Sequence, residues 1–288
     1  MTLVPILALG NAALSAASTI FIRQGLRKAD AFTGFWINLI VGAVGMWIAV
    51  LATGSIGHVS RTGVLIFVIA GLLGTVGGRL LRFLSIEKVG ASIASAVGNL
   101  QPMISTTLAI LILGEQVTIP ILTGTIVIVV GTVLLSISRG GTGFRPALIV
   151  FPLMSATCFG AVQVLRKAGL AHMGPVMATA VNYTAALIAF SALMLSVGHR
   201  GILTCRGRTL AQFVLSGIAE NGAVFLLIVA LSIGKVSVVT PLTASAPIFV
   251  LLLSPFFLRG LEIVNARVIT GTLLIVVGVA VITTLGGR

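Results

Sequence analysis

The sequence predicts an all-α membrane protein with ten transmembrane helices, arranged as two inverted five-helix repeats. Of its 288 residues, 58% are hydrophobic and only 8% are charged, whereas an average soluble domain has about 25% charged residues. So few charges cannot cover a water-soluble surface. A disordered chain is also excluded, because such chains are polar and rich in charge. Long apolar segments and an internal repeat support the same fold.

Ten apolar segments are long enough to span a bilayer, which requires about 20 residues each. Short polar connections separate them, such as Lys28–Asp30 after the first segment and Gly114–Gln116 after the fourth. These connections leave no room for a soluble domain, so we expect the protein to act within the membrane. In order, the segments cover approximately residues 4–24, 33–53, 63–85, 91–113, 117–137, 146–165, 175–197, 209–232, 237–258 and 266–286.

The fifth and tenth segments have nearly the same sequence. ILTGTIVIVVGTV begins at Ile121, and VITGTLLIVVGVA stands at the corresponding place in the tenth segment. When this alignment of the two segments is extended, Glu115 aligns with Glu262, and both residues lie outside the apolar sequence. The chain therefore divides into two five-helix halves, residues 1–138 and 146–288. Because each half has an odd number of helices, we expect the second to be inverted, as in secondary transporters that bind substrate near the midplane.

Glycines recur on one face of each of these two similar segments. Gly124 and Gly131 are seven residues apart, and so are Gly271 and Gly278. Small residues at this spacing let transmembrane helices approach closely. We therefore interpret the four glycines as packing positions rather than ligand contacts.

The second half contains LLIVALSIGKVSVVTPLTASAPIFVLLLSPFFLRGLE followed by VITGTLLIVVGVAVI, and the first half repeats the pattern from RFLSIEKVGASIASAVGNLQPMISTTLAILILGEQ. An apolar helix with a central proline, a Gly–Glu at its end and then a glycine-spaced helix resembles the EamA-type branch of the drug/metabolite transporter superfamily, in its ten-helix members. One departure is an extra residue between Gly260 and Glu262. The resemblance covers nearly the whole chain and implies transport of a small metabolite. It does not specify which, because such families move amino acids, purines, vitamins, sugars, phosphorylated metabolites and cationic drugs.

Glu220 is the one acidic residue placed near the middle of an apolar segment. An ionisable group at the bilayer centre costs about 2.5–3.5 kcal/mol or more, so it is a functional candidate. Ser216 lies one turn earlier on the same face, and Asn221 adjoins it. Glu220 is predicted either to carry a proton during transport or to stay ionised and attract a cationic group. The structural alternative is a protonated Glu220 hydrogen-bonded to a neighbouring helix.

Arg79 and Arg82 lie towards the end of the third segment. The interpretation that we prefer for them is that both side chains extend to the membrane interface. The third and eighth segments are repeat counterparts, however, and a partial ion pair between Arg79 and Glu220 is the alternative.

Other polar residues mark further candidate positions in the spans. Prolines at positions 102, 241 and 247 free backbone carbonyls inside two of these segments, as at the binding sites of many transporters. For each residue the alternative is an interhelical hydrogen bond, which contributes about 0.6 kcal/mol on average. The candidates are Asn11, Ser15, Asn99, Gln101, Asn182, Tyr183 and Thr243.

Several function classes are excluded. The chain has no His-Glu-x-x-His, Gly-x-Ser-x-Gly or Walker motif, so we expect neither an enzyme nor ATP-driven transport. Cys158 and Cys205 have no neighbours at metal-ligand spacing, and neither a metal nor a cofactor is expected. The net charge of +13 comes from single or paired basic residues, without the aromatic interleaving of a nucleic-acid site. Both a monomer and a homodimer are compatible with these features.

The basic residues also bear on orientation. Lys and Arg are concentrated after the odd-numbered segments, and the positive-inside rule then places these loops in the cytoplasm and both termini outside. The resemblance to ten-helix transporters instead implies that both termini are inside. We give slightly more weight to the distribution of charge.

The combined prediction is a multi-pass secondary transporter of the cytoplasmic (inner) membrane. We expect an exporter of small organic metabolites that works by alternating access, with proton coupling through Glu220. The first alternative is an uncoupled exchanger that recognises anionic metabolites through Arg79. The second alternative is a membrane scaffold or subunit that moves no solute, although such a protein has little need of an acid in mid-membrane.

Overall fold

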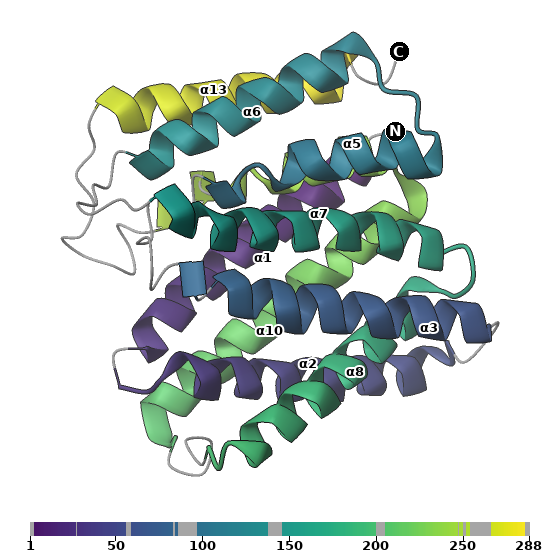
Figure 1. The fold of residues 1–288 in the computed structure, drawn as a ribbon, viewed down its shortest axis with the longest axis vertical. Helices are drawn as coiled ribbons and strands as arrows, with labels where there is room; N and C mark the ends of the chain where they lie inside the picture. The colour runs from purple at the N-terminus through teal and green to yellow at the C-terminus, as the bar shows by residue number, and fades with distance from the viewer. Residues whose placement is uncertain are drawn as a thin grey trace.

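The computed structural model describes residues 3–26, 28–55, 59–82, 84–85, 97–137, 146–199, 205–246, 248–249, 252–253 and 266–285. Every element in these residues is helical (Figure 1). The elements of the first half are α1 (Leu3–Gly25), α2 (Ala31–Thr53), α3 (Arg61–Ala70), the π-helix η1 (Gly71–Gly78), α5 (Gln101–Leu113) and α6 (Ile119–Ile137). Those of the second half are the short 3₁₀ helix η2 (Pro146–Ile149), α7 (Val150–Gly169), α8 (Pro175–Ser196), α10 (Gly207–Ile233), α11 (Val236–Thr243) and α13 (Ala266–Leu285).

Helices are long and apolar enough to cross a bilayer at five places in the described chain. They cover Leu3–Ile22, Ala31–Thr53, Arg61–Arg82, Pro175–Ser196 and Gly207–Ile233. Gln101–Leu113, Ile119–Leu134 and Ile269–Leu285 are shorter apolar helices. The start of the predicted fourth segment and most of the second half of the ninth lie outside the described residues. The structure therefore supports a multi-pass helical protein without confirming ten spans.

Local sequence explains where several helices begin and end. Asp30 caps α2 by accepting a hydrogen bond from the backbone N–H of Thr33, and Gly54 ends the helix in the left-handed conformation, at φ 62°. α11 contains Pro241, which cannot donate to the carbonyl four residues before it, and the helix ends at Thr243. The predicted ninth segment, 237–258, is broken at Ala244–Ser245, where the chain forms a turn.

Each of the main helix pairs has a counterpart in which every helix is replaced by the corresponding helix of the other half. The contact of α1 with α10 has its counterpart in the contact of α7 with α3 and η1, and the contact of α5 with α7 corresponds to that of α11 with α1. Likewise, α2 packs on α10 as α8 packs on η1. Three further pairs, α2 with α8, α5 with α11 and α6 with α13, are their own counterparts. This arrangement agrees with two repeats of one architecture.

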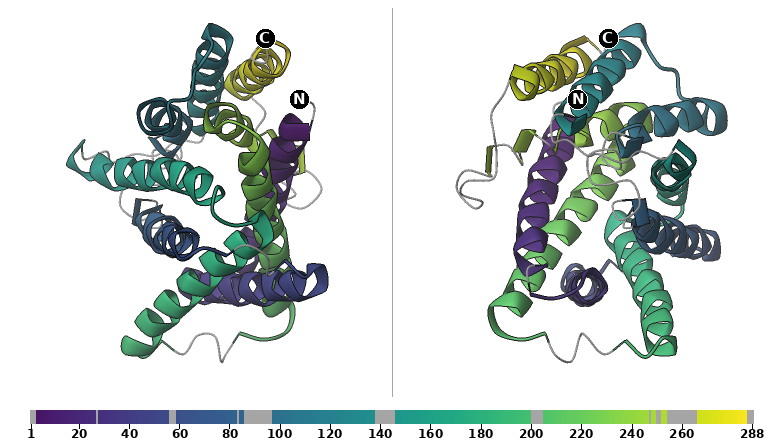
Figure 2. Two further views of the ribbon diagram at one scale, coloured as in Figure 1. Left: turned by 90° about the vertical axis from the view of Figure 1, so that its right-hand side faces the viewer. Right: turned by 60° about the vertical axis from the view of Figure 1, so that its left-hand side comes forward.

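The pair α6–α13 lies at one end of the molecule and the pair α2–α8 at the other (Figures 1 and 2). Between α6 and α13, a Cβ added at Gly131 would lie 2.7 Å from the carbonyl oxygen of Gly271, and one added at Gly278 would lie 2.7 Å from that of Gly124. The predicted packing role of the four glycines is confirmed.

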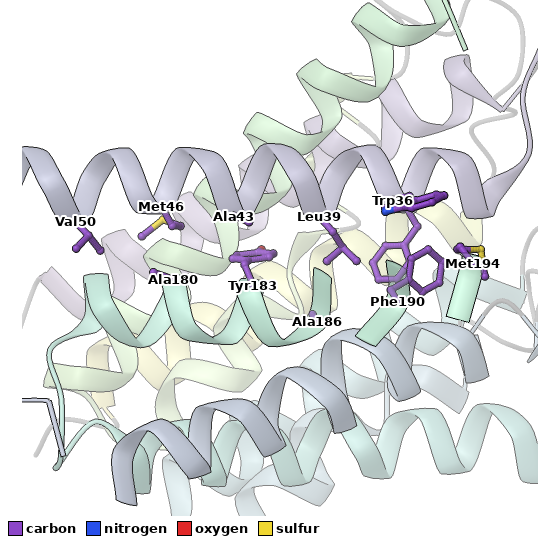
Figure 3. Packing of buried hydrophobic residues seen from close by; sticks show 11 residues of the cluster. Trp36, Leu39, Ala43, Met46, Val50, Ala180, Tyr183, Ala186, Phe190 and Met194 are labelled. Carbon is purple, nitrogen blue, oxygen red and sulfur yellow. The ribbon is translucent and has the colours of Figure 1, made fainter. Parts of the chain in front are cut away.

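A buried cluster joins α2 to α8 (Figure 3). Trp36 and Phe190 pack at one end of it, and Tyr183 lies opposite Ala43 nearer the middle. Two indole N–H groups strengthen the contact, since Trp36 donates to the hydroxyl of Ser191 at 2.8 Å and Trp47 to that of Thr184 at 2.9 Å. Because α2 and α8 come from different halves, this cluster holds the repeats together.

Candidate functional site

Arg79 and Glu220 form an ion pair in the interior of the helix bundle. Nη2 of Arg79 donates to Oε1 of Glu220 at 3.0 Å, and the side chains are only 18% and 23% exposed. The preferred interpretation from sequence, that Arg79 extends to the interface, is therefore wrong, and the alternative of an ion pair is confirmed. Leaving the Arg79 guanidinium unpaired inside the bundle would be costly. The carboxylate of Glu220 therefore determines the conformation of the Arg79 side chain.

The π-helix η1 positions Arg79, which directly follows it. Two glycines of η1 let the second half approach, because a Cβ at Gly71 would lie 2.6 Å from the carbonyl oxygen of Asn182 and one at Gly74 would lie 2.8 Å from Val162. π-helical turns are rare and frequently mark functional sites. The guanidinium of Arg79 also lies 5.1 Å from the centre of the Phe35 ring, a cation–π contact that holds the side chain in place.

Arg166 is a buried cation that the sequence predicts only as a loop charge. The predicted sixth segment stops at residue 165, whereas α7 continues to Gly169 and buries Arg166 in its last turn. Nη2 of Arg166 contacts Oδ1 of Asn182 at 3.5 Å, and Nδ2 of Asn182 donates to the hydroxyl of Thr75 at 3.2 Å. The adjacent cations Arg166 and Lys167 were a usable sequence signal, because two neighbouring side chains on a helix cannot both face the same way.

Tyr183 belongs to the same region. It is buried, and its hydroxyl lies within electrostatic range of Arg166, Arg79 and Glu220. The structure thus brings together four of the predicted residues, Arg79, Glu220, Asn182 and Tyr183, and adds Arg166 and Thr75. These side chains come from η1 and the turn after it in the first half, and from α7, α8 and α10 in the second. We refer to these six residues as the central polar cluster.

Three other predicted residues join helices. Asn11 donates to the carbonyl of Ala223 at 2.7 Å, which links α1 to α10. Ser216 donates to Oδ1 of Asn38 at 3.0 Å, and Asn221 donates to the carbonyl of Asn38 at 3.0 Å, so both connect α10 to α2. These hydrogen bonds correspond to the structural alternative stated for such residues. They fix α10, the helix that carries Glu220.

The remaining predicted residues are Ser15, Asn99, Gln101 and Thr243. Thr243 donates to the carbonyl of Thr240 at 2.8 Å within its own helix, and the carbonyl of Ser15 accepts from Thr19 at 2.8 Å in α1. Gln101 is the first residue of α5, and Asn99 stands two residues before it. These hydrogen bonds of Ser15 and Thr243 stay within their own helices.

One cavity of about 280 Å³ lies elsewhere, between α1, α13 and the residues that follow α11. Its walls are almost entirely apolar and share no residue with the central polar cluster. An apolar hollow of this kind suits a hydrocarbon chain better than a polar metabolite. The lining residues are Leu9, Ser245, Ile248, Phe249, Leu252, Val276 and Val279.

This chain is similar to known proteins over one repeat and over nearly its whole length. "Uncharacterized protein MJ1333.1" of Methanocaldococcus jannaschii is 32% identical over 134 residues, which are 96% of that protein and 46% of this chain. That relative therefore has about the length of one repeat. A solved structure described as "Crystal structure of protein" has a TM-score of 0.82 at 20% identity, covering 97% of this chain and 96% of that one. At this identity the likeness concerns the fold alone.

The model of the EamA-like transporter family matches the chain twice, over residues 2–137 and 146–284. The two matches divide the chain into two repeats. Members of this family are transporters of the drug/metabolite type and not enzymes, in agreement with the missing enzyme motifs. A small-molecule substrate and a lipid bilayer are therefore the partners of this multi-pass protein. The chain belongs to the EamA-like transporter family.

Proposed function

We propose that the protein is a secondary transporter that exports small organic metabolites across the cytoplasmic membrane by alternating access, with Glu220 as its proton-coupling group. The two halves act as inverted repeats that open alternately to each side. The exchange symmetry of the helix packing supports this arrangement, because such repeats interconvert by adopting one another's conformation. The substrate binds at the central polar cluster, where both halves contribute side chains.

The observation that carries the proposal is the ion pair between Arg79 and Glu220. It joins the third predicted segment to the eighth, across 141 positions of sequence, at 3.0 Å. Protonation of Glu220 removes one of the two charges and leaves Arg79 free to contact substrate. Deprotonation restores the pair and competes with the substrate for Arg79. A single proton thereby changes both the affinity of the site and the contact between the halves, as a coupled transporter requires.

Glu220→Gln is expected to abolish accumulation driven by a pH gradient, because a carboxamide cannot bind and release a proton. Proteoliposomes with an imposed pH gradient, supplied with a pool of radiolabelled metabolites, provide the measurement. Glu220→Asp keeps the titrating group and is the matched control, for which partial transport is expected. Continued concentration of solute by Glu220→Gln along the pH gradient would contradict the coupling role.

A second candidate function is uncoupled exchange of anionic metabolites through Arg79. It is favoured by the local surplus of positive charge, since Arg82 and Arg166 lie within electrostatic range of Arg79, whereas Glu220 is the only acid in this group of described residues. In this case Glu220→Gln spares exchange between preloaded vesicles and medium, while Arg79→Ala abolishes it. The same vesicles therefore discriminate between the two functions.

Cys205 tests the orientation inferred from charge. It lies between α8 and α10, in the loop that the charge distribution places in the cytoplasm. Partial burial, together with the negative charge of Asp30, raises the pKa of its thiol above the ordinary value, so the reactive thiolate increases only at higher pH. In a Cys158→Ser background at pH 8.5 or so, a membrane-impermeant maleimide is expected to label permeabilised but not intact cells. Labelling of intact cells from outside would reverse the orientation.

A further inference from the structure

The guanidinium of Arg166 is buried, and its Nε donor is unused in the described part of the chain. The residue is 6% exposed, and Nε has no partner among the described residues. Its contact with Oδ1 of Asn182, at 3.5 Å, lies at the limit of hydrogen bonding. A guanidinium offers five N–H donors, and burying such a cation without partners is strongly unfavourable. This arrangement is expected where a ligand supplies the missing acceptor.

Tyr183 presents a second unused donor beside it. The side chain is 1% exposed, and within the part of the chain that the structure describes its hydroxyl has no hydrogen-bond partner. A buried tyrosine hydroxyl usually has one. The hydroxyl lies within electrostatic range of the Arg166 guanidinium. The ring of Tyr183, packed between α8 and α2, holds it there (Figure 3).

The chemistry of the two groups specifies the ligand. Nε and Nη2 form the edge of a guanidinium that binds a carboxylate with two parallel hydrogen bonds. The hydroxyl of Tyr183 adds a third donor, whereas a cationic group would meet the like charge of Arg166 there. In the structure the charge of Arg79 faces Glu220 at 3.0 Å, whereas the electrostatic partners of Arg166 are Tyr183 and the like charge of Arg79. The ligand group that fits Arg166 is therefore a carboxylate.

We propose that Arg166 and the hydroxyl of Tyr183 form a binding subsite for a carboxylate group of the transported metabolite. The proposal rests on the proposed transport function, because it assigns the subsite to the substrate. The subsite is distinct from Arg79, which is available to substrate only when Glu220 is protonated, whereas Arg166 has no acidic partner among the described residues. Asn182, held by its hydrogen bond to Thr75, orients the guanidinium from the η1 side.

The stability of two variants tests the subsite without knowledge of the metabolite. Arg166→Met keeps the length of the side chain and removes an unpartnered buried charge, so the purified variant in detergent is expected to unfold at the same temperature as the wild-type protein or higher. Tyr183→Phe removes only a hydroxyl that has no partner and is expected to leave the midpoint unchanged. A clear loss of stability in either variant would show a structural role and overturn the proposal.

Ligand binding provides the second measurement. The shift of the unfolding midpoint is measured with straight-chain monocarboxylates of two to eight carbons, with benzoate, and with the uncharged amide of each acid. All solutions have equal ionic strength, with chloride as the reference anion. At least one acid is expected to stabilise the wild-type protein more than its amide does. Tyr183→Phe should weaken binding of that acid about tenfold, because one hydrogen bond to a charged group is lost. Arg166→Met should eliminate the shift of the unfolding midpoint. Equal shifts for every acid and its amide, or an undiminished shift in Arg166→Met, would reject the subsite.

Transport assays separate this inference from the function on which it rests. If an acid binds through Arg166 but no solute crosses proteoliposomes, the transport function fails and the carboxylate subsite stands. If Arg166→Met and Tyr183→Phe transport a solute as the wild-type protein does, the function stands and the subsite is wrong.

Discussion

Replacing Arg79 by Met is expected to lower the free energy of unfolding by about 3–5 kcal/mol and to abolish transport. The substitution leaves the Glu220 carboxylate in the bundle interior without the guanidinium that now lies 3.0 Å away. It also removes the cation that rests against the ring of Phe35. Thermal unfolding of the purified protein measures the loss of stability, and proteoliposomes measure transport.

A double-mutant cycle separates the ion pair from other effects at these positions. Arg79→Met combined with Glu220→Gln removes both charges and is expected to regain most of the lost stability, because no unpaired charge then remains. Arg82→Met is the comparison variant, because Arg82 lies within electrostatic range of Glu220 but its side chain is exposed, so its loss should cost less than the loss of Arg79. If the two single variants prove additive, the ion pair contributes nothing and Arg79 acts in another way.

Gly131→Val is expected to destabilise the contact between α6 and α13 by about 3 kcal/mol. The added Cβ would lie 2.7 Å from the carbonyl oxygen of Gly271 and 3.0 Å from the backbone nitrogen of Ile275, so the two helices would have to move apart. Neither of these backbone atoms can rotate away as a flexible side chain can. The measurement is the midpoint of thermal unfolding in detergent.

The matched control for this substitution is Gly45→Val in α2. A Cβ at Gly45 meets nothing within 4 Å in the described structure, and both glycines are helical, so the helix propensities cancel. The control is expected to unfold within a few degrees of the wild-type protein. Equal losses in the two variants would mean that the close approach of α6 to α13 does not contribute to stability.

Much of the fold is predictable because its determinants are local. A stretch of about 20 apolar residues must satisfy its own backbone hydrogen bonds in lipid, and a helix does so without distant partners. The similarity of the fifth and tenth segments likewise identifies two repeats from the amino-acid sequence alone. Their glycines predict the close packing of α6 on α13, which the distances at Gly131 and Gly278 confirm.

The candidate site is only partly predictable, for a physical reason. Glu220 stands out because an acid in the middle of a membrane span is costly and is therefore rarely present without a function. Arg166 does not, because a cation near a segment end is equally consistent with a loop, and only the continuation of α7 to Gly169 places it inside the bundle. Asn11, Ser216 and Asn221 looked similar to Asn182 in sequence, and all four form interhelical hydrogen bonds, but of these only Asn182 also contacts a cation of the central polar cluster.

The sequence by itself determined that this protein lies in the membrane, that it consists of two related halves and that Glu220 is exceptional. These properties depend on composition and on spacing along the chain. Only the tertiary structure decided that Arg79 is the partner of Glu220 and that Arg166 and Tyr183 retain unused donors. Whether a buried polar group is satisfied depends on atoms that folding brings within about 3 Å from distant parts of the chain, and no local pattern records that distance.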